Sequence, residues 1–472
     1  MLEAIIDYAG AVDSVLWGPW TMLFIAAVSV YITLRSGFFQ IRKLGLILRT
    51  TFGGIVGRSK PGGSGIMTPF QATSTALAST VGMGSIAGVA TALSIGGPGA
   101  IFWMWLLAMF GMMSKMAEIS LAVHYREVEG EGRIHGGPMY YINKGLGWGL
   151  LAKLFSLGIL INSIISATLL QSHTVGRAFL ASYNFNPYMV TGLMAVVTAV
   201  VVVGGIRRIG RFCEKLVPAM SFVYIACGLT IFFFNWARIP DVFSTIFFYA
   251  FSPAPVAGGF AGAAVMAAIQ EGMKKGMLSN EAGLGTAPMA HATADTPHPV
   301  QQGMWGAFEV FVVTFVICTI TSFAVISTGV LSSGKSGIEL VILAFSSVFP
   351  QEVAAAILSF SILTFCLTTQ IGFFIYYETS IINLVGERAM RVMKWVYLIP
   401  GVIFAGIADV DRLWVFANVA VGVCAIPNLI AVLALSGVFF KLLRDCFSGE
   451  NKYATAVTDF SRNYIKVAPS VR

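Results

Sequence analysis

The sequence predicts an all-α polytopic membrane protein, and its composition, its long apolar runs and the placement of its basic residues all point to this class. Of the 472 residues, 57% are hydrophobic and only 11% are charged, and the mean hydropathy is +0.80. A soluble globular chain carries about 25% charged residues. So few charged side chains cannot cover a water-facing surface, and we therefore expect lipid to surround much of the chain.

Apolar runs along the chain are long enough to cross a bilayer as helices. A transmembrane helix needs about 20 apolar residues, and only helices and closed barrels satisfy their backbone polar groups in lipid. The runs are unbroken, which excludes the alternating pattern of barrel strands. We predict eleven transmembrane helices, at residues 14–34, 68–93, 99–123, 149–181, 187–205, 215–236, 242–270, 303–331, 351–384, 393–409 and 412–440.

Basic residues gather in alternate loops between these runs, which predicts the orientation of the chain. The clusters are Arg35, Arg42, Lys43, Arg49, Arg58 and Lys60; Arg207, Arg208, Arg211 and Lys215; Lys274 and Lys275; Arg388, Arg391 and Lys394; and Lys441 and Arg444. Lys and Arg concentrate in cytoplasmic loops, so we expect the N-terminus outside and the C-terminus in the cytoplasm. The net charge of +8 is then a topology signal, and no nucleic-acid partner is expected.

The helices after the first divide into two equal groups. Ten helices split as five plus five in opposite orientation, which predicts a five-plus-five inverted repeat beside one peripheral helix. The expected organisation is a peripheral first helix with a basic cytoplasmic loop over 1–67, a first repeat over 68–236, a second repeat over 237–440 and a cytoplasmic tail over 441–472.

The first helix of each repeat is interrupted by glycines. Gly82 and Gly84 interrupt the first, and Gly258, Gly259 and Gly262 interrupt the second. A glycine inside a helix costs about 1 kcal/mol relative to alanine, and paired interrupted helices mark the midplane binding site of transporters. Close packing of helices through small residues is the alternative.

Ionisable residues inside the predicted spans are candidates for function. Lys115 and Glu118 are three residues apart, so we expect them to pair on one helix face. Glu309 is a candidate gate residue, and Glu281, in the loop that follows the second interrupted helix, is expected to help close an inner gate. No carboxylate lies at either glycine-rich break, which favours a metal cation bound by neutral oxygens over a proton as the coupling ion.

Other classes of protein fit the sequence poorly. The polar loops are short and contain no nucleophile–base pair, so no enzyme is predicted. His124 and His135, or His291 and His298, lack the spacing of metal ligands. A channel would need a repeated pore lining or a filter, whereas paired broken helices suit alternating access. The six cysteines are scattered and are expected to be small buried hydrophobes.

Six segments carry a family resemblance. They read TVGMGSIAGVAT at 80–91, GGPGAIFWMW at 96–105, GGPMYY at 136–141, SNEAGLG at 279–285, QGMWG at 302–306 and AIPN at 425–428. In this order and spacing they closely resemble the alanine or glycine:cation symporter family. The resemblance covers nearly the whole chain, and it implies a LeuT-type fold and sodium symport of alanine, glycine or a close relative.

The resemblance also implies a site. The main sodium site would be formed by the carbonyls of Ala78 and Val81 and the hydroxyls of Thr368 and Thr369. The substrate would meet Met83, Gly84, Ser85, Gln171, Phe260 and Phe373. A broken helix also frees backbone N–H groups at the positive end of a half-helix, which suits a carboxylate. The alternative for the two threonines is a hydrogen bond to a carbonyl of their own helix.

The sequence departs from the family pattern around the expected pocket. Gly82-Met83-Gly84-Ser85 stands for the usual Gly-Thr-Gly-Asn, Phe373 for a tryptophan, and Thr168 and His173 for paired asparagines. We therefore expect sodium-coupled import of a small neutral amino acid such as alanine, D-alanine or glycine across a bacterial inner membrane. The alternatives are a proton-coupled carrier of a related amino acid and, less favoured, a channel.

Overall fold

The computed structural model describes residues 2–56, 65–129, 133–252, 261–406 and 410–448, and most of them are helical. Six helices are long and apolar enough to cross a membrane: Gly99–His124, Gly149–Tyr183, Ile206–Phe234, Pro299–Ser327, Gln351–Val385 and Leu413–Ala434. Two bent helix pairs, Ile6–Leu16 with Pro19–Arg35 and Pro69–Thr80 with Gly84–Gly96, raise the number to eight. The all-α membrane class is therefore confirmed, whereas the count of eleven stays a prediction.

The first half of the chain forms the following elements. They are α1 (Leu2–Leu16), α2 (Pro19–Arg35), α3 (Phe39–Arg42), α4 (Leu44–Val56), α5 (Pro69–Thr80), the π-helical turn η1 (Gly84–Gly88), α6 (Val89–Gly96), α7 (Gly99–His124), the antiparallel strands β1 (Glu127–Glu129) and β2 (Arg133–His135), α8 (Pro138–Leu146), α9 (Gly149–Asn162), the π-helical η2 (Ser163–Leu169), α10 (Leu170–Tyr183), α11 (Pro187–Val202) and α12 (Ile206–Phe234).

The second half continues with shorter segments at both ends of the long helices. They are the 3₁₀ turn η3 (Trp236–Arg238), α13 (Ile239–Phe251), α14 (Ala261–Asn280), α15 (Ala287–His291), α16 (Pro299–Val310), the π-helical η4 (Phe311–Cys318), α17 (Thr319–Ser327), the 3₁₀ turn η5 (Val330–Ser333), α18 (Gly337–Ser346), α19 (Gln351–Val385), α20 (Glu387–Val396), α21 (Ile399–Ile403), α22 (Val410–Ala434) and α23 (Ser436–Phe447). The predicted tail thus begins inside α23.

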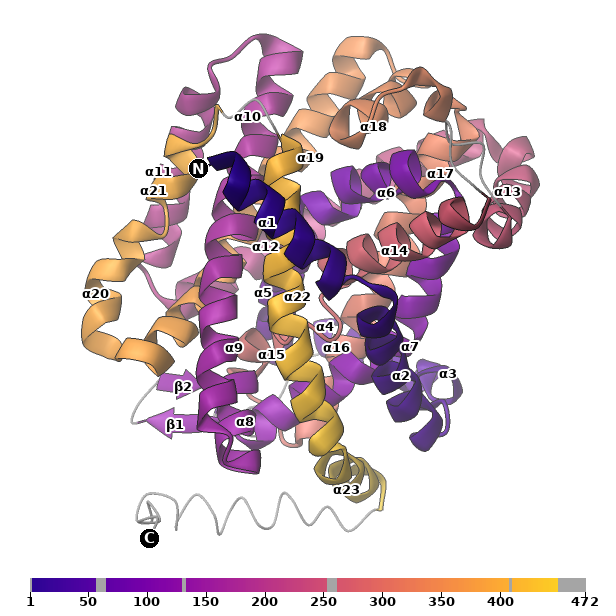
Figure 1. Ribbon diagram of the computed structural model, residues 1–472. Coiled ribbons are helices and arrows are strands. Elements are labelled where there is room, and N and C mark those ends of the chain that lie inside the picture. Colours follow the sequence, from indigo (N-terminus) through magenta and orange to yellow (C-terminus); the bar gives the residue numbers. More distant parts are fainter. Residues whose placement is uncertain (1, 57–64, 130–132, 253–260, 407–409, 449–472) are drawn as a thin grey trace, which may run out of the picture.

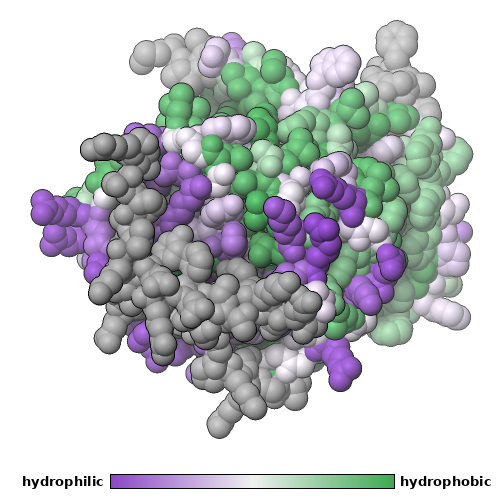
Figure 2. All heavy atoms as spheres, turned by 90° about the horizontal axis from the view of Figure 1, so that it is seen from below, coloured by the Kyte–Doolittle hydropathy of each residue, from purple (hydrophilic) through white to green (hydrophobic). Residues whose placement is uncertain are grey.

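The long helices stand side by side, and short elements gather at the two ends (Figure 1). α8, β1, β2 and α23 lie at the lower end, α18 lies at the upper end, and α1 crosses the front of α22 and packs against it. Figure 2 shows the lower face, where hydrophilic side chains gather while apolar ones continue around the edge. This arrangement fits a polar lower end that borders an apolar outer surface.

The first predicted break is confirmed. Pro69 occupies the first turn of α5, and Thr68 and Gln71 cap its start reciprocally, as a capping box does. The helix ends at Thr80, and the chain resumes after a bend of 52° in the π-helical turn at Gly84–Gly88. Two glycines and a β-branched residue, Val81, therefore interrupt this helix at the predicted place.

The second predicted break, at Gly258, Gly259 and Gly262, stays a prediction. Gly258 and Gly259 lie outside the described residues, and α14 runs without interruption from Ala261 to Asn280. The interruption that faces the first break is the segment 281–286 between α14 and α15, in which Glu281, Gly283 and Gly285 have positive φ angles. α14 packs against α6, and α15 packs against α5, so these two broken helices lie together.

Two basic residues that were predicted in a cytoplasmic loop lie within a helix. Lys274 and Lys275 lie within α14 and not in a cytoplasmic loop. The ammonium group of Lys274 is 3.2 Å from the carboxylate of Asp13, and that of Lys275 lies 3.7 Å from the centre of the Trp414 ring. Both side chains therefore hold helices together.

Candidate functional site

A small cavity of about 20 Å³ lies between the first break and the segment that follows α14. The helices that enclose it are α5, α9 with η2 and α10, α14 with the segment that follows it, and α19. Its lining residues are Ser79, Thr80, Gly82, Met83, Gly84, Asn162, Ser166, Leu170, Gln171, Leu278, Glu281, Leu284, Thr369 and Phe373. The lining combines hydroxyls, amides and one carboxylate with apolar side chains, as sites for small polar ligands do.

Two predicted sodium ligands meet at one edge of this cavity. The hydroxyl of Thr369, on α19, donates a hydrogen bond of 3.1 Å to the carbonyl oxygen of Ala78, on α5. A Cβ atom on Gly82 would come within 2.6 Å of the same hydroxyl, so the chain needs a glycine here. Two oxygens from different helices thus converge beside the break.

The other predicted sodium ligands do not join them as closely. Thr368 donates to the carbonyl oxygen of Phe365 at 3.0 Å, and its hydroxyl lies 3.5 Å from the sulfur of Met220 on α12. Thr368 does not line the cavity. Val81 is buried directly after α5 and is likewise absent from the lining. Thr369 also lies within hydrogen-bonding distance of the Phe365 carbonyl, at 2.9 Å, so both threonines show the hydrogen bond to their own helix that the sequence left open as the alternative.

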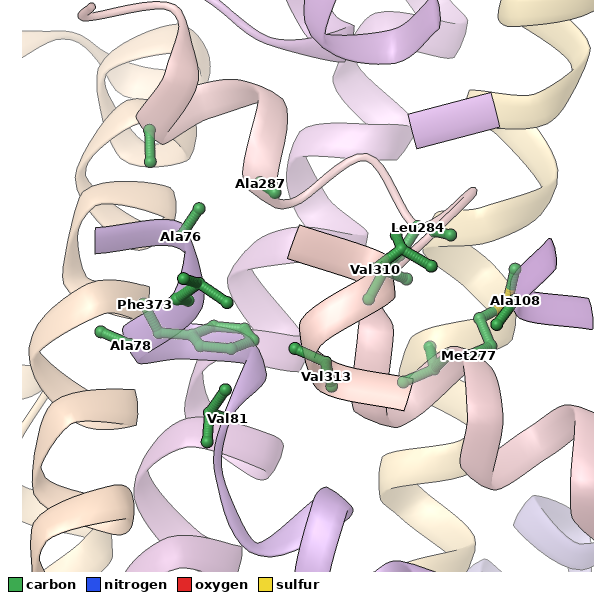
Figure 3. Packing of buried hydrophobic residues seen from close by; sticks show 14 of the residues in the cluster. Ala76, Ala78, Val81, Ala108, Met277, Leu284, Ala287, Val310, Val313 and Phe373 are labelled. Carbon is green, nitrogen blue, oxygen red and sulfur yellow. The ribbon is translucent and has the colours of Figure 1, made fainter. Parts of the chain in front are cut away.

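Several predicted substrate residues do line the cavity. The side-chain oxygen of Gln171 accepts a hydrogen bond of 3.5 Å from the backbone N–H of Met83, and its amide nitrogen donates to the carbonyl of Ser166 at 3.1 Å. Gly84 follows at the start of η1. The ring of Phe373 lies beside the segment of α5 that carries Ala78 (Figure 3). Four of the six predicted substrate residues therefore share one cavity.

The remaining two do not. Ser85 points away from the cavity and shares a hydrogen bond of 2.8 Å with the hydroxyl of Ser279, which in turn lies 3.1 Å from the sulfur of Cys318. Phe260 lies outside the described residues. The serine that replaces the family's asparagine is thus engaged between η1, α14 and η4.

Four polar residues of the lining were missed by sequence reasoning, namely Ser79, Thr80, Asn162 and Ser166. Asn162 accepts a hydrogen bond of 2.7 Å from Ser166, one helical turn later, and this i, i+4 spacing near Gln171 was the available signal. Glu281 was expected at a gate, yet it lines the cavity, and Thr286 donates a hydrogen bond of 2.6 Å to it. Glu281 lies in the segment between α14 and α15, and its side chain is buried.

A buried ionic cluster lies next to this segment and corrects the predicted pairing of Lys115 with Glu118. The ammonium group of Lys115 is 3.4 Å from the carboxylate of Glu309 on α16 and donates to the carbonyl of Asn280 at 3.0 Å. Glu118 instead accepts a hydrogen bond of 3.0 Å from Asn428 on α22. The cluster therefore ties α7 to the end of α14, to α16 and to α22.

His291 completes this cluster. Its ring lies 3.2 Å from the Glu309 carboxylate and 2.7 Å from the amide nitrogen of Gln302. Within the described ranges no three His, Cys, Asp or Glu side chains are arranged to hold a metal ion. The imidazole serves as a hydrogen-bonding partner between α15 and α16.

Comparison with known proteins identifies the family. The model of the sodium:alanine symporter family matches residues 2–459. The chain belongs to this family. It is 37% identical over 440 residues to an uncharacterised transporter of Haemophilus influenzae, covering 93% of this chain and 95% of the relative. It is 36% identical over 441 residues to the sodium/alanine symporter AgcS of Methanococcus maripaludis, covering 92% and 95%.

Among solved structures, a manganese transporter of Eremococcus coleocola has a similar fold. The TM-score is 0.50 at 11% identity, with 78% of each chain covered. At this identity the likeness concerns the fold alone. The family places the chain among polytopic membrane transporters, and the apolar helices fit an inner membrane.

Proposed function

We propose that the protein is a sodium-coupled symporter that imports a small neutral amino acid, namely alanine, D-alanine or glycine, by alternating access. The observation that carries the proposal is the 3.1 Å contact between the Thr369 hydroxyl and the Ala78 carbonyl beside a broken helix. Sodium is a hard cation that prefers oxygen ligands of this kind. The relative AgcS is named a sodium/alanine symporter, which supports the same substrate and ion.

In this proposal the cation and the amino acid bind on either side of the first break. Sodium is held by the carbonyls of Ala78 and Val81 and the hydroxyls of Thr368 and Thr369, after the Thr368 hydroxyl has turned from the carbonyl of Phe365. The two ligands stabilise the same closed arrangement of the broken helices, and this shared preference couples their transport.

The amino acid carboxylate binds the backbone N–H groups of Met83 and Gly84, where the positive end of a half-helix begins. The Gln171 oxygen now accepts from the N–H of Met83 at 3.5 Å, so it must move aside when the substrate enters. Phe373 packs against the substrate side chain, with Phe260 as its predicted counterpart. Ser85 acts only indirectly, through its hydrogen bond to Ser279.

The proposed architecture is the LeuT-type arrangement of one peripheral helix and ten core helices in two inverted repeats, over 68–236 and 237–440. It includes eleven spans, an external N-terminus and a cytoplasmic C-terminus. The second broken helix is the predicted span 242–270, with its break at Gly258, Gly259 and Gly262. Alternating access would then move these half-helices and α5–α6 against the remaining core helices.

A proton-coupled carrier is the second candidate, and one observation favours it. The sequence argument against a proton was the lack of a carboxylate at the breaks, whereas Glu281, in the segment that follows α14, lines the cavity. A titratable group in such a position is typical of proton relays.

Uptake into proteoliposomes tests the proposal. Labelled L-alanine, D-alanine and glycine are offered under an inward sodium gradient, with potassium and proton gradients of equal size as controls. The proposal expects accumulation of at least one of the three with sodium alone. Accumulation that follows the proton gradient would favour the second candidate, and counterflow without trans-acceleration would indicate a channel.

A further inference from the structure

We propose that the carboxylate of Glu281 binds the α-ammonium group of the transported amino acid. The inference rests on the proposed function and supplies its missing half. Backbone N–H groups at Met83 and Gly84 account for the substrate carboxylate, but a zwitterion also needs an acceptor for its ammonium group. The cavity lining contains one carboxylate, and it is that of Glu281.

The chain holds Glu281 in a fixed, uncommon conformation. Its φ angle is +54°, a left-handed value that few residues other than glycine adopt. The backbone N–H of Glu281 donates to the carbonyl of Met277 at 2.8 Å, and its own carbonyl accepts from Leu284 at 3.2 Å. Thr286 donates to the Oε2 atom at 2.6 Å. The carboxylate is therefore positioned by its own segment, and strained positions of this kind cluster at functional sites.

The burial and the charge of Glu281 call for a cation. Its side chain is 2% exposed, and a buried carboxylate is costly unless it is paired. The nearby Lys115 forms its ion pair with Glu309. Over the described ranges of the chain, Glu281 forms no ion pair of its own, and its Oε1 atom accepts no hydrogen bond from a described residue. A ligand that brings a positive charge into the cavity meets this need.

The surroundings fit an ammonium group better than a second sodium ion. Leu278 and Leu284 flank Glu281 in the cavity lining, whereas the hydroxyls and amides of the lining lie on the other helices that enclose the cavity. An ammonium group needs about three acceptors. Ser79 of the lining shares a hydrogen bond of 2.7 Å with the hydroxyl of Tyr376. Glu281 lines the same cavity as Met83 and Gly84, where the substrate carboxylate is expected.

The test compares alanine with lactate, which carries a hydroxyl in place of the ammonium group and keeps the carboxylate and the methyl group. Binding of both is measured with purified protein in sodium, for the wild type and for Glu281→Gln, with Glu281→Asp as the conservative variant. Hydrogen bonds to charged groups predict that Glu281→Gln weakens alanine binding about 10- to 100-fold. Lactate binding changes little, so the preference for alanine collapses, and Glu281→Asp restores part of it.

Three results would overturn the inference. Alanine and lactate could weaken by the same factor, which would indicate a structural role. The sodium dependence could shift while the preference for alanine stays, which would make Glu281 a cation ligand. The wild type could bind both compounds equally, a result that needs no folded variant. If the wild type binds no amino acid in sodium, the proposed function fails first and the inference falls with it.

Discussion

Removing the Thr369 hydroxyl should uncouple sodium from substrate binding. Thr369→Val keeps the shape of the side chain and deletes the oxygen that lies 3.1 Å from the Ala78 carbonyl. Without sodium the variant loses one neutral hydrogen bond between α19 and α5, worth about 1 kcal/mol. With sodium it loses an oxygen next to a charge, worth about 1.5–3 kcal/mol, which corresponds to a weakening of about 10- to 150-fold.

The assay is the sodium concentration that half-saturates alanine binding to the purified protein. Thr364→Val is the matched control, because that hydroxyl also lies on α19 but bonds only to the carbonyls of Phe360 and Ser361 in its own helix. The half-saturating sodium concentration of Thr368→Val should lie between those of Thr369→Val and Thr364→Val, since the Thr368 hydroxyl must leave the carbonyl of Phe365 before it can bind sodium. A Thr369→Val protein whose half-saturating sodium stays within about threefold of the wild type, or a control that loses as much, would refute the reasoning.

Three further substitutions test the roles of Gly82, Glu309 and His298. Gly82→Ala places a methyl group 2.6 Å from the hydroxyl of Thr369 and should weaken sodium-dependent alanine binding at least about tenfold. Gly88→Ala is the control, because its methyl group would have no contact closer than 3.8 Å, and this variant should bind alanine like the wild type. Glu309→Gln leaves the buried Lys115 without its ion-pair partner and should lower the free energy of unfolding by about 3–5 kcal/mol. Thermal unfolding measures this loss, and an unchanged melting temperature would contradict the structural role of the pair. Burial lowers the pKa of His298 in the folded protein. The stabilising contribution of the neutral imidazole is therefore complete when the pH is above the pKa of His298 in the unfolded chain, about 6.5, and it declines as the pH falls through that pKa. His298→Asn should flatten this part of the pH–stability profile. The asparagine keeps a side-chain acceptor for the backbone N–H of Val300, which now donates to His298 at 3.1 Å.

Local signals in the sequence were enough to predict the first broken helix and much of the cavity. Gly82 and Gly84 interrupt an apolar run, and the surrounding backbone needs no distant partner to break there. Gln171 and Phe373 came from the family resemblance, and they line the cavity because α19 packs against both α5 and α10.

The interruption between α14 and α15 and the buried charges could not be predicted in the same way. This segment carries only two spaced glycines and a glutamate at positive φ, a weaker glycine signal than the cluster Gly258, Gly259 and Gly262 on which the predicted second break rests. A positive φ at Glu281 depends on its neighbours in space. Lys115 likewise pairs with Glu309, far along the chain, and not with Glu118 on its own helix, because the packing of α7 on α16 decides which carboxylate it meets.

Coupling between the two fluxes tests the central claim most directly. Proteoliposomes with equal sodium concentrations on both sides receive an inward gradient of alanine, and the entry of radioactive sodium is followed with the membrane potential clamped. A sodium:amino-acid symporter must accumulate sodium against no initial gradient, and Thr369→Val should abolish this movement. Alanine entry without any sodium accumulation would contradict the account.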